Sequence, residues 1–153
     1  MSKVQEHWKN KEVLALECYV ENDDLVTIMD FYRVSDSGKI RYYAYPICDT
    51  TISSIEHYND DIWNQIEIHP NSIKQRNAIY YCGEGEMGNE GFIACTDESN
   101  NLKWSIFCTL SNPFIKMYFE KEKLVVESTS GVKFHIDIQN PKYLKLSVTQ
   151  DAY

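Results

Sequence analysis

Residues 11–47 read KEVLALECYV ENDD LVTIMDFYRV SDSG KIRYYAYPI, and this stretch decides the fold class. Apolar and polar residues alternate in the three longer segments, which is the two-residue period of a β-strand. The shorter segments, ENDD and SDSG, are rich in residues that form turns. The stretch therefore predicts three antiparallel strands joined by short turns, the third of them ending near Pro46.

The same pattern continues in the second half of the chain. Further strand-like runs occur at residues 78–82, 92–97, 102–110, 114–120, 124–127, 132–138 and 144–148. Most of them are followed by turns rich in Gly, Asn, Ser or Pro. Together they predict one mainly β domain over residues 1–153, an antiparallel meander of about nine strands that forms a curved sheet, a sandwich or a barrel.

Residues 51–66 are the ambiguous part of this pattern. Their apolar residues recur at steps of three and four, which favours a helix and makes an α+β protein the alternative fold class. Four β-branched isoleucines and the loop-like Asn59-Asp60-Asp61 favour instead two short strands, at residues 52–58 and 62–69. Pro70 ends either arrangement, and we expect a short helical turn at residues 71–77.

The composition favours a packed globular protein, with 43% apolar and 13% aromatic residues. The first eight residues lack the apolar core of a secretory signal, and no apolar run approaches the roughly 20 residues of a membrane helix. The five cysteines have long spacings without C-x-x-C, which is typical of reduced thiols in a cytosolic protein. We therefore expect a cytoplasmic protein with no membrane partner.

Charge is distributed unevenly along the chain. The net charge is −8 and the isoelectric point is near 4.9, which argues against nucleic acid as a partner because phosphates need a basic face. Between residues 44 and 100 there are ten acidic and two basic residues, so this third accounts for the whole excess. We expect these carboxylates to form one continuous surface that attracts a basic protein.

Residues 83–88 read GEGEMG and match the G-x-G-x-x-G pattern of nucleotide-binding loops. The loop leads into another strand-like run, and over about a dozen residues it resembles the strand–loop–strand phosphate cover of protein kinases. The companion lysine and the H-R-D and D-F-G motifs are missing, and Glu84, Glu86 and Glu90 would repel phosphate. We therefore expect a mobile hairpin loop or a flexible acidic contact loop, and no nucleotide or other cofactor.

No catalytic or metal-binding signature stands out. The four histidines are scattered, and the H-E-x-x-H and G-x-S-x-G motifs are absent. Residues 56–61, EHYNDD, group three acids with a histidine, as acid–base chemistry or a hard cation could use. A solvated or partner-binding acidic face explains the same residues more simply, so we predict neither enzyme activity nor a metal site.

These observations predict a non-enzymatic acidic binding protein that docks and neutralises a basic protein. In charge, size and expected compartment the chain resembles the broad class of small cytosolic immunity proteins, which neutralise cationic bacterial toxin domains such as nucleases. The alternative is a carrier of a small apolar ligand, with a cavity inside a β-barrel. The residues expected to bind the basic partner are the acids Asp60, Asp61, Glu84, Glu86 and Glu90, with Trp63 and Tyr80 as aromatic anchors.

Overall fold

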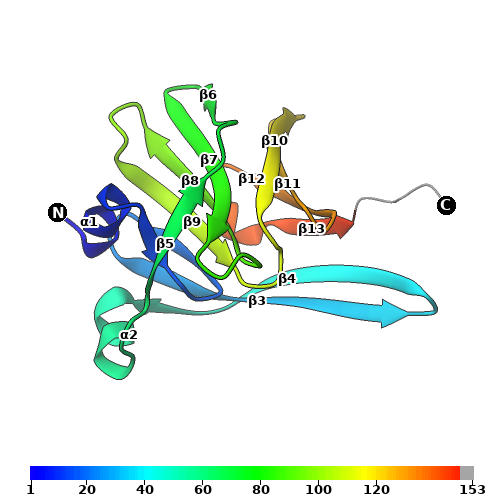
Figure 1. Cartoon of the computed structure of the whole chain (residues 1–153), viewed down its shortest axis with the longest axis horizontal. Coiled ribbons are helices and arrows are strands. Elements are labelled where there is room, and N and C mark those ends of the chain that lie inside the picture. The colour runs from blue at the N-terminus through cyan, green and yellow to red at the C-terminus, as the bar shows by residue number, and fades with distance from the viewer. Residues whose placement is uncertain (149–153) are drawn as a thin grey trace.

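The computed structural model describes residues 1–148 (Figure 1). Their secondary structure comprises two α-helices, thirteen strands and one 3₁₀ helix. In chain order these are α1 (Lys3–Lys9), β1 (Glu12–Leu14), β2 (Cys18–Glu21), β3 (Leu25–Asp36), β4 (Lys39–Thr51), α2 (Ile52–Tyr58), β5 (Trp63–Ile68), β6 (Ile73–Gln75), β7 (Ala78–Gly85), β8 (Gly91–Asp97), β9 (Leu102–Cys108), β10 (Phe114–Glu120), β11 (Lys123–Ser128), β12 (Val132–Asp137), η1 (Pro141–Tyr143) and β13 (Lys145–Val148).

The strands form two antiparallel sheets. The larger sheet has nine strands in the order β1-β5-β7-β8-β9-β2-β3-β4, with β6 paired to β7 beside this path, and it curls into a half-barrel. The smaller sheet is the meander β10-β11-β12-β13. Figure 1 shows the smaller sheet beside the curled one, with the long β3–β4 hairpin extending beneath it. The prediction of a mainly β antiparallel fold is confirmed.

Both faces of the curled sheet are buried. On β8, Ile93 belongs to a core cluster shared with the smaller sheet, whereas its neighbour Phe92 belongs to a second cluster, which α1 and α2 help to form. Successive strand residues point to opposite faces, so β8 is covered on both sides. In the first cluster the ring of Phe134 lies 4.9 Å from that of Phe114 and 5.5 Å from that of Phe31, measured between centroids.

The first three predicted strands are found with two changes: the third does not end near Pro46 but continues through it to Thr51, and the first is divided. Strands β2, β3 and β4 form the expected meander, and the β3–β4 pairing runs from Leu25 opposite Thr51 to Asp36 opposite Lys39. The predicted strand at residues 11–20 is instead two strands, because the chain leaves the sheet after Leu14 and returns at Cys18. Strand β1 pairs with β5 and β2 with β9, so the two halves lie in different parts of the sheet.

Residues 51–66 combine the two predicted alternatives. The first half forms a helix, and the second half leads into a strand. Helix α2 begins after Thr51, whose hydroxyl oxygen accepts a hydrogen bond from the backbone N–H of Ser54 at 3.1 Å. The helix ends at Asn59, which is extended, and β5 follows after a turn in which Asp61 has a φ of 59°. The helical turn expected at residues 71–77 is wrong, because β6 occupies this segment and pairs with β7.

Helix α1 was not expected from the sequence. It is one of two seven-residue α-helices, and its buried apolar face consists of Val4 and Trp8. Two apolar positions are too few to produce a visible helical period. Its start is fixed by Ser2, whose hydroxyl accepts from the backbone N–H of Gln5 at 3.1 Å. Within residues 1–148, no helix has the length and apolar character needed to cross a membrane.

Candidate functional site

The candidate site lies where β5 runs beside the end of β7. In this pairing Ile66 lies opposite Gly85, Glu67 opposite Glu84, and Ile68 opposite Gly83. A Cβ atom added at Gly83 would lie 2.0 Å from the backbone oxygen of Glu67, so only glycine lets the strands approach this closely. The first glycine of the nucleotide-binding pattern therefore serves strand packing, whereas Gly88 has no atom within 4 Å of an added Cβ and has a φ of +77°.

A buried glutamate holds the loop that follows β7. Glu90 is 8% exposed, and its Oε1 accepts hydrogen bonds from Asn64 Nδ2 at 2.9 Å and from the backbone N–H of Met87 at 3.3 Å. Asn64 Oδ1 in turn accepts from the backbone N–H of Glu86 at 3.4 Å. These bonds tie the loop to β5, which gives the loop a structural anchor. Glu90 therefore points inward and is not available as a partner-binding residue.

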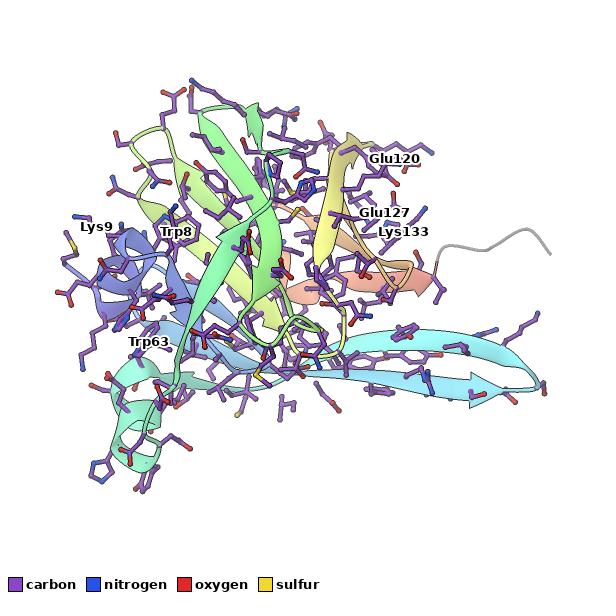
Figure 2. All side chains as sticks on the ribbon, viewed as in Figure 1. Trp8, Lys9, Trp63, Glu120, Glu127 and Lys133 are labelled. Carbon is purple, nitrogen blue, oxygen red and sulfur yellow. The ribbon has the colours of Figure 1, made fainter. Side chains whose placement is uncertain are left out.

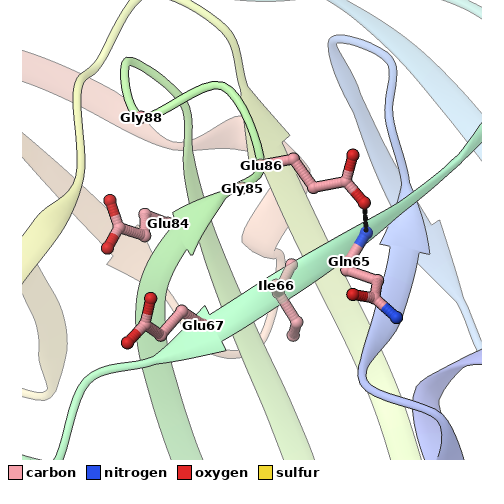
Figure 3. Close-up of a pocket in the computed structure, with 7 residues that line it drawn as sticks. All are labelled: Gln65, Ile66, Glu67, Glu84, Gly85, Glu86 and Gly88. Atoms are coloured by element: carbon pink, nitrogen blue, oxygen red, sulfur yellow. Dashed lines mark hydrogen bonds between the residues drawn. The ribbon is translucent and has the colours of Figure 1, made fainter.

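The groove itself has a volume of about 290 Å³ and is polar. Figure 3 shows Glu67 and Glu84 on neighbouring strands and Glu86 reaching toward β5, where its carboxylate accepts from the backbone N–H of Gln65 at 3.1 Å. None of the residues around the groove is basic; they are Gln65, Ile66, Glu67, Glu84, Gly85, Glu86 and Gly88.

Two of the carboxylates around the groove face each other across the sheet. Glu67 and Glu84 are register partners in an antiparallel pair, where directly opposed Cβ atoms lie about 4.5–5.5 Å apart. Like charges in this position repel each other and destabilise the pair. Within residues 1–148, no salt bridge of either glutamate to a lysine, arginine or histidine is found. The groove therefore holds negative charge that its own lining does not neutralise.

The predicted acids Asp60 and Asp61 lie apart from this groove. Both are exposed in the loop between α2 and β5, and Asp61 precedes Glu67 by six residues. The extended stretch of β5 from Trp63 to Glu67 alone covers about 13 Å at about 3.3 Å per residue, which exceeds the screening length of about 8 Å at physiological salt. The two aspartates add to the negative field of this side of the molecule but do not line the groove.

The two predicted aromatic anchors are engaged inside the protein. Tyr80 is 4% exposed and packs against the rings of Trp104 and Phe119, and burial raises the pKa of its hydroxyl to about 12. Trp63 is half-buried and stacks on His7 with a centroid separation of 3.7 Å, so it fastens α1 to β5. Figure 2 labels Trp63 and Trp8 on the side of the molecule where α1 lies. Tyr80 is therefore excluded as a surface anchor, and Trp63 has a packing role.

The expectation of one continuous acidic surface is wrong. Outside the groove, several acids between residues 44 and 100 have partners of their own. Glu56 pairs with Lys3 at 2.6 Å, and Glu98 pairs with Lys74 at 3.5 Å. Asp97 accepts from the backbone N–H groups of Ser99 and Asn101, and these bonds, chiefly those from Asn101, lower its pKa. Among residues 1–148, the acids of this third of the chain are therefore divided between the groove, the buried Glu90, the Asp60–Asp61 pair, the bonded positions 56, 97 and 98, and Asp49, which accepts from the hydroxyl of Thr27.

A second, smaller groove adjoins the first. Its volume is about 130 Å³, below the roughly 300–1,000 Å³ usual for small-molecule sites, and it shares Glu67 and Glu84 with the larger groove. His69 also lines it, with an Nδ1 atom that is buried and has no hydrogen-bond partner among the described residues. Neither groove has the size and apolar lining that a carrier of a small apolar ligand needs.

Within residues 1–148 we find no metal-binding cluster, and most of the cysteines are buried. No three His, Cys, Asp or Glu side chains of residues 1–148 come together in a way that could hold a metal ion. All five cysteines are free thiols, and only Cys48 is exposed. Burial raises the pKa of Cys82 to about 12 and that of Cys95 to about 11, so these thiols stay protonated and unreactive near neutral pH.

Comparison with protein-family models, with curated proteins and with solved structures finds no match for this chain. The geometry of the groove is therefore the basis for the function proposed below.

Three residues of this site were not predicted from the sequence. Glu67 is one of the ten acids between residues 44 and 100, but the sequence does not show that it lies opposite Glu84, because this depends on the pairing of β5 with β7. Gln65 and Asn64 carry no distinctive signal, since their roles depend on contacts with Glu86 and Glu90, more than 20 residues away. The predicted strand at residues 62–69 was the one sequence feature that pointed to this site. It places Gln65 and Glu67 on the same face, because alternate residues of a strand share a face.

Proposed function

We propose that this protein is a non-enzymatic binding protein whose groove of Glu67, Glu84 and Glu86 docks a basic protein. The observation that carries the proposal is the pairing of Glu67 with Glu84 on adjacent strands, with no basic residue in the groove lining. A cationic side chain entering between them would relieve their repulsion and gain two attractive contacts. An immunity or antitoxin-type inhibitor would use such a groove to cover the cationic surface of a toxin domain.

Three features of the groove suit protein recognition. Two of its carboxylates stand on paired strands, and the third accepts a backbone hydrogen bond, so little ordering entropy is lost when a partner binds. The exposed side chain of Met87 on the adjoining loop offers an adaptable apolar contact at the rim. The aspartates at 60 and 61 extend the negative field and would accelerate encounter with a basic partner.

The experiment captures partners from a lysate of the source organism on the immobilised protein, identifies a basic protein by mass spectrometry, and purifies it for kinetics. The groove variant is E67Q/E84Q/E86Q. Its matched control is E6Q/D60N/D61N, which removes the same three charges at exposed positions outside the groove. We expect the complex of the groove variant to dissociate much faster, and the control to associate somewhat more slowly with an unchanged dissociation rate.

The salt dependence supplies the second readout. Association of the unmodified protein should slow steeply as ionic strength rises, because exposed charges are screened. If the groove variant binds the purified partner as tightly as the unmodified protein does, the groove is not the docking site. If it is the complex of the control that dissociates much faster, the docking site is the aspartate loop instead.

A further inference from the structure

The β3–β4 hairpin extends beyond the rest of the protein. Figure 1 shows its outer half projecting past the body, and Figure 2 shows side chains on both sides of the ribbon there. Every residue from 33 to 41 is exposed. A two-stranded hairpin without further support is at best marginally stable in water. Residues 33–41 therefore lack the packing that supports the other strands. We call residues 30–45 the arm; they comprise this exposed end and the pairs that join it to the body through the buried Phe31.

One face of the arm carries a cluster of stacked tyrosines. Tyr32 and Tyr43 are cross-strand partners with centroids 5.3 Å apart, and Tyr45 lies 6.3 Å from Tyr43 with nearly parallel rings. Tyr45 is 53% exposed, and Val34 on the same face is 40% exposed. Tyrosine and arginine are the residues most often found at the centre of protein interfaces, so this face has the composition of a contact surface.

The charges on this face are arranged symmetrically about the tyrosine pair. On this face, the next residue pair toward the body is Asp30 opposite Tyr45, and the next pair toward the tip is Val34 opposite Arg41. Neither Asp30 nor Arg41 forms a salt bridge within the described residues. Consider two copies that pack tyrosine face to tyrosine face, with the twofold axis at the tyrosine pair, in the plane of contact and perpendicular to the strands. Arg41 of each copy would then lie over the Asp30–Tyr45 pair of the other.

The geometry points to a second copy of this chain as the occupant of the tyrosine face, in a twofold dimer that joins arm to arm. The surface is self-complementary in the way that a twofold interface requires, with negative charge at one end, positive charge at the other and stacked rings between them. Each Arg41 gains a carboxylate and an aromatic face from the partner copy. The dimer would also cover the exposed apolar side chains of this face and support the arm.

Sedimentation equilibrium from micromolar to millimolar protein tests the proposal, with four variants checked for folding by circular dichroism. Reversal of either charge, by R41E or D30R, should weaken the dimer about tenfold, because two contacts related by the twofold axis are lost together. The double variant D30R/R41E should restore it, because each new arginine then faces a new glutamate of the partner copy. The matched control is R33E, an equal charge reversal on the opposite face of the same arm.

A unique pattern of outcomes supports the dimer: association of the unmodified protein, loss in both single variants, recovery in the double variant and no change in the control. A chain that stays monomeric across the whole range overturns the proposal, including the case in which the arm binds a different protein. So does a double variant as weak as the single ones, or a control variant weakened as much as R41E. None of these results bears on the glutamate groove, which is tested separately.

Discussion

Replacing Glu84 by glutamine should stabilise the folded protein, although it removes a charged residue from the candidate site. Glu84 lies directly opposite Glu67 in the β5–β7 pair, and the lining of the groove contains no basic residue that offsets their repulsion. Glutamine has nearly the same shape and keeps a polar end, so the substitution removes the charge and little else. The gain in unfolding free energy should therefore equal the repulsion between the two carboxylates.

The size of this gain follows from the separation of the charges. Two unit charges about 6 Å apart repel each other by about 0.7 kcal/mol in bulk water, and opposed like-charged pairs in sheets cost about 0.2–1 kcal/mol. For a domain of about 150 residues, 1 kcal/mol corresponds to about 2–4 °C in the midpoint of thermal unfolding. We expect E84Q to raise the midpoint by about 1–3 °C at low salt, and by less as salt screens the charges.

A double-mutant cycle isolates the repulsion. Urea unfolding of the unmodified protein, E67Q, E84Q and E67Q/E84Q gives the coupling energy between the two positions. Either single variant should be stabilised, and the second substitution should add almost nothing. Additive effects of the two substitutions at low salt would refute the reasoning, because they would mean that the carboxylates do not interact. The same E84Q protein should bind the basic partner more weakly, the usual conflict between stability and function.

Three further predictions concern the surroundings of the groove and a histidine of the smaller sheet. Gly83→Ala should cost about 1–3 kcal/mol in urea unfolding, because its Cβ would collide with the backbone oxygen of Glu67, whereas Gly88→Ala meets no atom within 4 Å and should cost about 1 kcal/mol for its positive φ. Glu90→Leu should cost about 1–3 kcal/mol by leaving the Asn64 amide without an acceptor, and should speed hydrogen exchange in the loop after β7. His135 has a pKa lowered mainly by burial, so the unfolded chain takes up its proton first as pH falls, and stability is lost from about pH 6.5 downward; H135Q should flatten this part of the pH profile measured by thermal unfolding.

Local sequence patterns predicted the elements that are stabilised locally. The alternation in residues 25–34 and 39–47, with the SDSG turn between them, is a property of neighbouring residues, and β3 and β4 are found there. The split of residues 11–20 into β1 and β2 was not predictable in this way. Apolar and polar residues continue to alternate between β1 and β2, so the break between the two strands leaves no trace in the pattern. The extent of β1 is set instead by its pairing with β5, about 50 residues further along the chain.

The charge of the glycine-rich segment does not reveal its structural role. The glutamates of residues 83–90 disfavour a phosphate cradle but do not indicate why the glycines are there. The reason for Gly83, the close approach of β5, depends on a strand that the sequence placed only as one of two alternatives. The burial of Glu90 was not predictable either. A sequence does not distinguish a buried glutamate from an exposed one until its hydrogen-bond partner, here Asn64, is known.

The candidate site depends on the register of β5 against β7. This register cannot be predicted from the sequence, but substitutions can test it. Shifting β5 by one residue against β7 would move Glu67 to the other face of the sheet and separate it from Glu84. The present register is fixed by two local constraints: the missing side chain at Gly83, which β5 needs for its approach, and the Asn64–Glu90 hydrogen bond, which anchors the loop. The negative charge of the groove is thus held in place by uncharged packing and by one buried carboxylate. Removing that carboxylate should therefore disturb the groove more than removing any of the three that line it.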